Sequence, residues 1–314
     1  MKSLAFCFTL LSTIAISIVA SLPAQAQQRA RAFVSIHGND SNPCTALSPC
    51  KTFQAAHDAV LAGGEISVLD TGGYGTLTIT KALSIVAVGV EASIAIPSGG
   101  TGIIISAGAS DAVNLRGLTI DGSGIGGSGI AFLSGKSLVI DNCVVRNLQS
   151  SGIAVVPTAS ATIAVSKTLV ADNGGHGIFV QPISDASTFG IVNALFNRVE
   201  VYNNGGEGIG IFVNAAPQFD VEAKIVDSVS YNNKNGFYAL GSSSNNNGDN
   251  AEISLLRSAT FANLSGSIVA DTRSRILVAQ GSIDLDLNWS GTVITYGDSY
   301  STSRPPPDGQ LPRE

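Results

Sequence analysis

The sequence has few charged residues and no excess of basic ones. Charged residues make up 13% of the 314, and 17 Lys and Arg stand against 23 Asp and Glu, so the formal net charge is −6. Nucleic acids are bound through clustered basic side chains, and the sequence contains no basic stripe. Nucleic acid is therefore excluded as an expected partner. The acidity favours a neutral partner over a polyanionic one.

Cysteine is scarce as well, with four residues in the chain. Cys7 falls in an N-terminal segment that we expect to be removed, and Cys44 and Cys50 stand six residues apart in a loop rich in turn formers. In an oxidising exported compartment this spacing predicts a local disulfide between Cys44 and Cys50. Cys143 remains unpaired in a strand-like run, and we expect a buried small hydrophobe rather than a reactive thiol.

Long apolar runs are absent beyond the first residues. Lys2, the run from Leu4 to Ala20 and the sequence Ala24-Gln25-Ala26 predict a signal peptide of residues 1–26. The run is close to membrane-spanning length, so a retained anchor is the alternative. We expect cleavage before Gln27 and an exported protein, periplasmic or extracellular, with no membrane span afterwards.

Glycine, in contrast, is abundant, with 35 residues. Nine glycines are each followed within two residues by an apolar, mostly β-branched residue, and they recur at steps of 23 to 31 residues. Such a period in a β-rich chain indicates a β-helix solenoid, here of about nine coils. The nine are Gly75, Gly102, Gly129, Gly152, Gly177, Gly208, Gly236, Gly266 and Gly291.

Alignment of the coils on this glycine produces columns of like residues. Two apolar columns follow the glycine with a period of two, so both are predicted to point into one core. They are Ile130, Ile153, Ile178, Ile209 and Phe237, and Phe132, Val155, Val180, Ile211 and Ala239. An asparagine precedes the glycine, with a β-branched residue three positions earlier, and both are predicted to form stacked ladders. They are Asn147, Asn173, Asn204, Asn232 and Asn263, and Val144, Val170, Val201, Val229 and Thr260.

Helical periodicity is confined to one stretch near the start of the mature chain. Ser48-Pro49 supplies an N-cap and a first-turn proline for a short amphipathic helix through about Leu61, ended by Gly63-Gly64. This helix is predicted to cap the exposed end of the solenoid. His57 lies beside its apolar stripe and is interpreted as a packing residue rather than a ligand.

The predicted organisation has four segments and three insertions. The segments are the signal peptide, an N-terminal cap at 27–64 that contains the disulfide and the helix, a parallel β-helix at 65–301, and a disordered Pro-rich tail at 302–314. The insertions follow the glycine-led strand, and insertions on one side of a solenoid commonly build its binding face. They are Gln181 to Leu195, Asn214 to Lys224 and Gly241 to Ala251.

The residues that follow Cys44 and Cys50 carry a family resemblance. Lys51-Thr52-Phe53, Gly63-Gly64-Glu65 and Asp70 to Gly75 resemble the opening of exported bacterial β-helix proteins without an assigned activity. Over about residues 32–300 the chain resembles the right-handed parallel β-helix superfamily, which has the pectin-lyase-like fold. The resemblance implies an all-β, right-handed solenoid. It implies no single activity, because the fold hosts enzymes, adhesins and scaffolds.

The enzymatic patterns of this fold are matched only in fragments. Gly175-His176-Gly177 resembles one element of polygalacturonase-type hydrolases, but residues 148–152 lack the pair of aspartates that such hydrolysis needs. A pectate-lyase-like site would need acids that hold Ca²⁺ and a basic residue. Arg198 and Lys234 are the nearest basic residues and Asp227 is an acidic candidate, with Glu200 placed to neighbour Asp227 across coils. Apart from Ca²⁺ in that lyase-like case, no metal site or cofactor is predicted.

Two groups of residues break the repeat and become the candidate site. His176 and Glu207 precede the aligned glycine on consecutive coils, so they can share a proton as an acid/base pair; the alternative is a solvated turn whose residues vary freely. Phe179, Phe212 and Tyr238 take outward positions on the glycine-led strands. With Gln181 beside them they suit stacking on sugar rings, unless the inserted loops bury them.

These observations predict an exported, single-domain β-helix that binds a polysaccharide or cell-surface glycan without catalysis. The first alternative is a polysaccharide lyase or glycoside hydrolase that acts on uronate-rich polymers through His176, Glu207, Arg198 and Asp227. The second alternative is a structural or adhesive surface protein.

Overall fold

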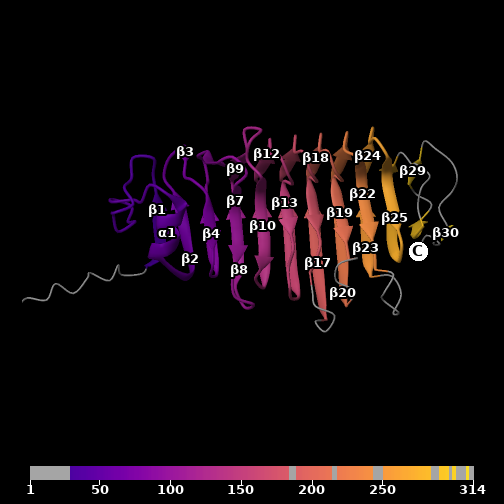
Figure 1. Ribbon diagram of the computed structural model, residues 1–314, viewed down its shortest axis with the longest axis horizontal. Helices are drawn as coiled ribbons and strands as arrows, with labels where there is room; N and C mark the ends of the chain where they lie inside the picture. The colour runs from indigo at the N-terminus through magenta and orange to yellow at the C-terminus, as the bar shows by residue number, and fades with distance from the viewer. Residues whose placement is uncertain are drawn as a thin grey trace, which may run out of the picture.

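The chain winds into an elongated stack of parallel strands (Figure 1). The structure is a computed structural model that describes residues 29–183, 189–213, 218–242, 250–283, 290–296, 299–301 and 309–310. Each coil of the solenoid adds one strand to each of three parallel sheets, here called sheets A, B and C. Apart from the short helix α1 (Phe53–Ala59), the described elements are strands, so the predicted all-β, right-handed parallel β-helix is confirmed.

The strands of each sheet follow one another along the stack. Sheet A contains β1 (Arg29–Val34), β2 (Val60–Val68), β5 (Leu83–Val86), β8 (Ala112–Arg116), β11 (Ser137–Asp141), β14 (Ala161–Ser166), β17 (Gly190–Asn197), β20 (Phe219–Val226), β23 (Ala251–Leu256), β26 (Ser274–Ala279), β28 (Thr292–Thr295) and β30 (Gly309–Gln310). Sheet B contains β3 (Gly72–Gly73), β6 (Ala92–Ala95), β9 (Leu118–Asp121), β12 (Val144–Arg146), β15 (Leu169–Ala171), β18 (Glu200–Tyr202), β21 (Val229–Tyr231), β24 (Ala259–Phe261), β27 (Ser282–Ile283) and β29 (Tyr300–Ser301). Sheet C contains β4 (Leu77–Ile79), β7 (Thr101–Ser106), β10 (Ser128–Ser134), β13 (Ile153–Val155), β16 (Ile178–Val180), β19 (Ile209–Phe212), β22 (Asn235–Leu240) and β25 (Gly266–Asp271).

The recurring glycine marks the entry into sheet C because two backbones approach closely there. A Cβ at Gly152 would lie 2.7 Å from the carbonyl oxygen of Gly177, and a Cβ at Gly177 would lie 2.7 Å from that of Gly208. Only glycine fits such a position. The first eight predicted glycines lead into the eight strands of sheet C. The ninth, Gly291, precedes β28 of sheet A instead, so the solenoid has about eight turns, close to the nine predicted.

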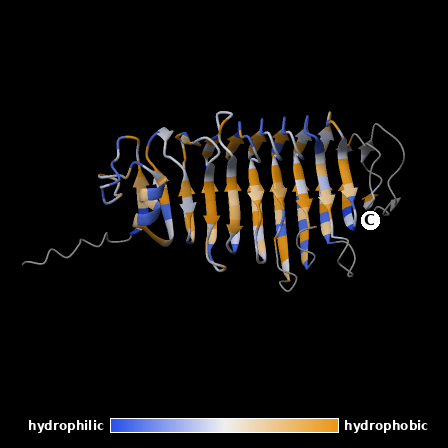
Figure 2. Cartoon of the chain, viewed as in Figure 1, coloured by the Kyte–Doolittle hydropathy of each residue, from blue (hydrophilic) through white to orange (hydrophobic). Residues whose placement is uncertain are grey.

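The core is built from the two predicted apolar columns of sheet C and their counterparts in the other sheets. Ile130 pairs with Ile153, and Ile153 with Ile178, and all three are fully buried. The second column, from Phe132 to Ala239, is in register and buried in the same way. Apolar stretches recur along the strands of successive coils (Figure 2). The prediction of both columns is confirmed.

The asparagine ladder is displaced by one residue in part of the stack. The ladder consists of the buried Asn173, Asn204 and Asn233 and the partly buried Asn263, and each side-chain amide donates to the side-chain carbonyl of the next at 2.9, 2.9 and 3.4 Å. Asn147 and Asn232, which the sequence alignment placed in this ladder, belong to the preceding column, with φ of 58° and 52°. Asparagine suits both columns, because it tolerates left-handed backbone and its amide can stack.

The β-branched ladder needs the same correction. The inward column of sheet B runs through Val145, Val170, Val201, Ser230 and Thr260. Val144 and Val229 lie one residue earlier and face outward, each only partly buried. Because side chains alternate along a strand, a shift of one residue exchanges the inner and outer faces.

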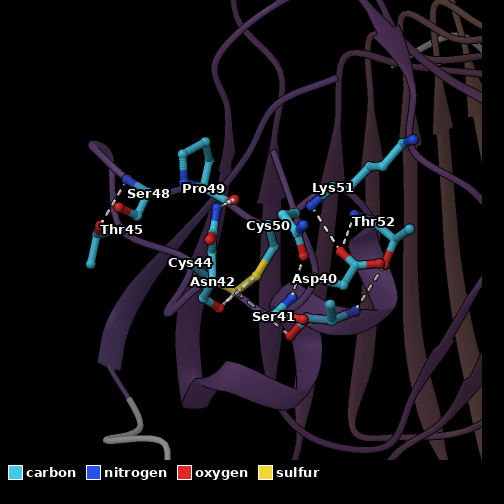
Figure 3. Close-up of a disulfide and its surroundings, with 12 residues drawn as sticks. Asp40, Ser41, Asn42, Cys44, Thr45, Ser48, Pro49, Cys50, Lys51 and Thr52 are labelled. Carbon is cyan, nitrogen blue, oxygen red and sulfur yellow. Dashed lines mark hydrogen bonds between the residues drawn. A yellow bond between two sulfur atoms is a disulfide. The ribbon is translucent and has the colours of Figure 1, made fainter. Parts of the chain in front are cut away.

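The N-terminal cap begins with a loop closed by the predicted disulfide between Cys44 and Cys50 (Figure 3). In the same loop the Asp40 carboxylate accepts the N–H groups of Lys51 and Thr52 at 2.8 and 2.9 Å. Thr52 is the N-cap of α1, since its hydroxyl accepts the N–H of Ala55 at 3.2 Å. The predicted start at Ser48-Pro49 was therefore too early, because Asp40 holds the chain extended up to Thr52.

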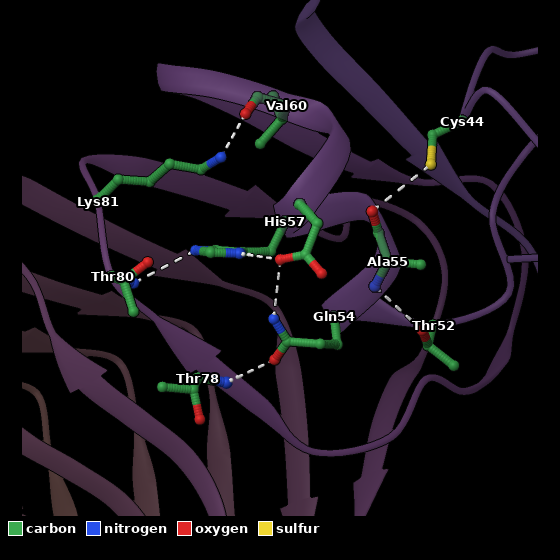
Figure 4. Close-up of polar contacts among 10 residues, drawn as sticks. Cys44, Thr52, Gln54, Ala55, His57, Val60, Thr78, Thr80 and Lys81 are labelled. Atoms are coloured by element: carbon green, nitrogen blue, oxygen red, sulfur yellow. Dashed lines mark hydrogen bonds and ion pairs between the residues drawn. The ribbon is translucent and has the colours of Figure 1, made fainter. Parts of the chain in front are cut away.

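Helix α1 is fastened to the first coil by polar contacts (Figure 4). His57 is buried; its Nδ1 lies 2.9 Å from the Asp58 carboxylate, and its Nε2 accepts the N–H of Thr80 at 3.3 Å. Gln54 accepts the N–H of Thr78 at 3.0 Å. His57 is thus a packing residue, as expected.

Other sequence predictions fall partly outside the described residues. The predicted signal peptide lies outside them, as does most of the tail at 302–314, although β30 pairs with β28 there. β1 and β2 already belong to sheet A, so this sheet extends into the segment predicted as a cap.

Among the described residues, no helix is long and apolar enough to cross a membrane. Cys143 is unpaired and buried, and burial raises its pKa to about 11.

Candidate functional site

His176 and Glu207 are in contact at the entry to sheet C. His176 lies in the turn before β16, and Glu207 lies at the equivalent place before β19, one coil later. The Nδ1 atom of His176 contacts Oε2 of Glu207, and the backbone N–H of Glu207 lies 3.2 Å from the same nitrogen. The structure therefore brings together the two residues that the aligned sequence placed side by side.

A short polar row extends this contact along the stack. The Ser151 hydroxyl accepts the backbone N–H of His176 at 3.2 Å. On the other side, Asn235 donates to Oε1 of Glu207 at 3.1 Å, and Nζ of Lys234 lies 3.9 Å from the same oxygen. Both carboxylate oxygens of Glu207 therefore have partners. Its side chain is 6% exposed, whereas that of His176 is 33% exposed.

The surroundings of Glu207 favour the ionised carboxylate. Burial by itself would raise its pKa, but the hydrogen bond from His176, the charge of that imidazole and the amide of Asn235 outweigh burial and lower the pKa. A buried anion thus lies against a half-exposed imidazole. Such a pair can hold and transfer a proton when a ligand is placed against the imidazole.

The predicted aromatic residues gather beside this pair, but they come from two columns rather than one. The register pairs Phe179 with Gly210, and Gly210 with Tyr238, whereas Phe212 lies two residues further along β19. A Cβ at Gly210 would lie 2.5 Å from the ring of Phe212. The ring of Phe212 therefore occupies the space above Gly210, between the coils of the other two aromatics.

The imidazole and the rings form one continuous surface. The centroid of His176 lies 5.3 Å from that of Phe179 and 5.4 Å from that of Phe212, and the centroids of Phe212 and Tyr238 are 5.3 Å apart. The three aromatic side chains are half-buried, so part of each ring is accessible. We call this surface, made of His176, Glu207, Phe179, Phe212 and Tyr238, the sheet C site.

Asp271 ends the sheet C site on the next coil, and sequence reasoning missed it. It accepts the Tyr238 hydroxyl at 3.2 Å, and burial together with the Asp271 charge raises the pKa of Tyr238 to about 12. A hydrogen bond from Ser290 and one from the N–H of Thr272 lower the pKa of Asp271. The alignment of the coils could have indicated Asp271, because it pairs with Leu240, two residues after Tyr238, on the neighbouring strand.

Gln181, the fourth predicted binding residue, lies at the edge of this surface. It follows β16 and is half-buried, and its backbone N–H bonds to Val155 at 2.8 Å. It stands one residue beyond the pair of Val180 and Ile211, which places it in the column of Phe212. The insertions expected to flank this surface are only partly described, since residues 184–188, 214–217 and 243–249 lie outside the described residues.

Arg198 and Asp227, the other two catalytic candidates, lie elsewhere, in the turn between sheets A and B. They are neighbours there, since the N–H of Arg198 bonds to the carbonyl of Val226 at 3.0 Å. Asp227 is paired with Arg257, with Oδ1 and Nε 2.7 Å apart. The register pairs Glu200 with Val229 and not with Asp227, a difference of two residues from the expected neighbour. The four candidates therefore form two groups, separated by sheet B.

A second aromatic row on the outer face of sheet B was not foreseen. The rings of Tyr202, Tyr231 and Phe261 stack at centroid distances of 4.9 and 5.2 Å with interplanar angles of 18° and 3°. The rings cover one another's faces and present mainly their edges, so this stack is less suited to sugar rings. Among the described residues, no group of three or more His, Cys, Asp or Glu side chains could hold a metal ion.

Comparison with known proteins bears on the fold. A family profile described as "Right handed beta helix region" matches residues 71–254. A search of curated proteins finds no match. Among solved structures, pectate lyase Pel9A aligns with a TM-score of 0.58 and 15% identity, over 90% of this chain and 78% of that one. XylC in complex with xylose aligns with a TM-score of 0.61 and 8% identity, over 86% and 69%. At these identities the likeness concerns the fold alone.

Proposed function

The chain belongs to the right-handed β-helix family, and on that premise we propose that it is an exported protein that binds carbohydrate at the sheet C site without chemical turnover. Export is supported by the apolar N-terminal run and by the disulfide between Cys44 and Cys50, a bond typical of oxidising compartments. The ligand is a polysaccharide or a cell-surface glycan.

One observation carries the binding proposal. Three half-buried aromatic rings lie on consecutive coils, two of them pack against the accessible imidazole of His176, and polar groups lie at both ends of the row. Sugars bind to such surfaces because ring C–H groups stack on aromatic faces while hydroxyls take hydrogen bonds. From β16 to β25 the site spans three strand spacings, about 14 Å, which suits a chain of several sugars.

The charges of the site favour a neutral sugar. Glu207 and Asp271 are both held ionised, since the pKa of each is lowered, and Lys234 is the nearby cation. A polyanionic chain would meet two carboxylates and be repelled, whereas neutral hydroxyls donate to carboxylates readily. The net charge of the whole chain acts in the same direction.

The test is calorimetric titration of neutral oligosaccharides into the protein and its variants. Phe212→Ala and Tyr238→Ala should each weaken binding tenfold or more, because each removes a ring from the centre of the surface. Phe261→Ala is the matched control, since Phe261 is an exposed ring on sheet B. An absence of glycan binding, or binding untouched by the two sheet C variants, would contradict the proposal.

The contact between His176 and Glu207 supports one further candidate, a polysaccharide lyase or glycoside hydrolase. In that case the pair moves a proton during cleavage of a uronate-rich polymer. The discriminating assay is release of unsaturated or reducing ends, with and without Ca²⁺, lost in His176→Ala and in Glu207→Gln. A structural or adhesive surface protein would show neither glycan affinity nor turnover.

A further inference from the structure

The turn from sheet A to sheet B places one residue per coil in left-handed backbone. These residues form a column along the stack, and their φ angles lie between 47° and 57°. The column consists of Asn142, Lys167, Arg198, Asp227, Arg257 and Gln280. Gly117 takes the same conformation one coil before Asn142, with φ of 75°.

Basic residues are unexpected in this column. Left-handed backbone is disfavoured for residues with a long side chain, whereas glycine, asparagine and aspartate adopt it readily. Gly117, Asn142 and Asp227 follow that rule, but Lys167, Arg198, Arg257 and Gln280 do not. Residues kept in a disfavoured conformation point to a role other than stability.

The basic residues differ in their partners. Arg257 is satisfied by Asp227, through two contacts at 2.7 and 3.1 Å. Nζ of Lys167 lies 3.9 Å from Asp141, whose carboxylate is also bound by Arg116 at 3.3 Å. Within the described part of the chain, the guanidinium of Arg198 makes no ion pair within 4 Å, although its charge lowers the pKa of Asp227 together with that of Arg257. Lys167 therefore has one long contact to a carboxylate that it shares with Arg116, and Arg198 has only the more distant charge of Asp227.

These two cations lie side by side. The N–H of Lys167 bonds to the carbonyl of Asn197, which immediately precedes Arg198, so the two residues occupy the same position on adjacent coils. In the described column they are the adjacent pair of like charge, whereas Arg198, Asp227 and Arg257 alternate in sign. Like charges directly opposite each other across strands repel. An anion between them would remove that repulsion.

A cavity opens at this place. It has a volume of about 330 Å³ and is lined by Lys167, Thr168, Leu169, Arg198 and Glu200. The Thr168 hydroxyl is already used, since it donates to the carbonyl of Ser166 at 2.8 Å, so the two cations are the donors left for a ligand. Glu200 adds one carboxylate to the lining, so an oxyanion has to be held by both cations to bind there.

We propose that this cavity binds an oxyanion, a carboxylate or sulfate group carried by an acidic partner, between Nζ of Lys167 and the guanidinium of Arg198. Guanidinium and ammonium groups are the usual partners of such anions. The cavity lies at the opposite edge of sheet B from the sheet C site, so it is a separate site and does not depend on the proposed function. It gives an otherwise acidic protein one local surface for an acidic ligand.

The experiment titrates three probes of equal length into the full mature protein: a neutral glucose oligosaccharide, its sulfated form and its 6-carboxylate form. The variants are Lys167→Asn, Arg198→Asn and the double variant. Asparagine suits left-handed backbone, as Asn142 does in the same column, so these variants should unfold at the same or a higher temperature. The double variant should bind the acidic probes at least tenfold more weakly than the wild type.

Arg257→Asn is the matched control, because it changes the same column outside the cavity and should leave the affinity within twofold. Comparison of the sulfated and carboxylated probes identifies which oxyanion is preferred. Two results would overturn the proposal: no preference of the wild type for acidic probes over the neutral one, or an equal loss in Arg257→Asn and in the double variant. Binding of the neutral probe at the sheet C site is measured separately by Phe212→Ala, so failure of one proposal leaves the other standing.

Discussion

Glu207 is a buried carboxylate that the fold keeps ionised. Its ionised state depends on contacts with His176 from the coil before and Asn235 from the coil after. These contacts form only when the three coils are in register. A carboxylate with a lowered pKa stabilises the folded state as long as it remains ionised. The residue therefore links the chemistry of the site to the stability of the stack.

Replacement of Glu207 by Gln should lower the free energy of unfolding by about 1–3 kcal/mol at neutral pH, because charged hydrogen bonds are lost in a buried setting. The folded pKa lies below the ordinary value of 4.5, so the contribution is fully present above pH 4.5 and is lost as the pH falls through the folded pKa. Urea unfolding of wild type and Glu207→Gln from pH 7 to pH 3 measures this difference. Glu222→Gln, at an exposed position, is the control and should change stability by less than about 0.5 kcal/mol. A difference that stays constant down to pH 3 would contradict the account.

For single residues, the sequence predicts which side chains point inward better than it predicts contacts between outward side chains. The column of Ile130, Ile153 and Ile178 follows from glycine spacing and a period of two. The contact of His176 with Glu207 follows from the same alignment. The position of Phe212 over Gly210 does not, because it depends on which way a side chain leans after the backbone is placed.

The buried asparagine ladder is the element that holds the turn from sheet B to sheet C. Asn204 accepts from Asn173 at 2.9 Å, donates to Asn233 at 2.9 Å and donates to the carbonyl of Tyr202 at 3.0 Å. Each amide therefore satisfies its neighbours above and below as well as the backbone. A ladder of this kind is costly to interrupt, because its partners are left buried without hydrogen bonds.

Asn204→Ala should lower the free energy of unfolding by about 2–4 kcal/mol, since it leaves the side-chain N–H groups of Asn173 without their acceptor and removes one of the two donors to Oδ1 of Asn233. Asn203→Ala is the matched control one residue earlier, where the side chain is exposed and φ is 56°. That change should cost about 1 kcal/mol, through left-handed backbone and the loss of two exposed hydrogen bonds, one donated to Asp172 and one accepted from Asn232. Chemical denaturation of both variants measures their free energies of unfolding. Equal losses in the two variants would mean that the buried ladder adds no more stability than the exposed position one residue earlier.

Elements were predicted less accurately at their ends than in their middles. The insertions predicted to reach Leu195 and Lys224 end earlier, because β17 and β20 already include those residues. Helix α1 starts at Phe53 because Asp40, twelve residues before Thr52, fixes the chain there. Such a contact between distant residues is invisible to local patterns of capping and proline.

The whole molecule is a stack of coils. The repeated residues build the scaffold, and the residues that break the repeat form two surfaces. Aromatic rings and carboxylates gather on the outer face of sheet C, and Lys167 and Arg198 line a cavity at the turn between sheets A and B. The number of turns was predicted within one, because the glycine at each entry to sheet C is required by close backbone approach. The separation of Arg198 and Asp227 from His176 and Glu207 needed the three-dimensional stack, since residues near in sequence lie at opposite edges of sheet B.

The most direct test of carbohydrate binding at the sheet C site uses NMR of the aromatic rings. The protein, with ¹³C-labelled Phe and Tyr, is titrated with the neutral oligosaccharide that binds best. The signals of Phe179, Phe212 and Tyr238 should shift with ligand concentration along one saturating curve, while those of the stacked rings of sheet B stay in place. Shifts confined to Tyr202, Tyr231 and Phe261, or no shift in any ring, would contradict the account.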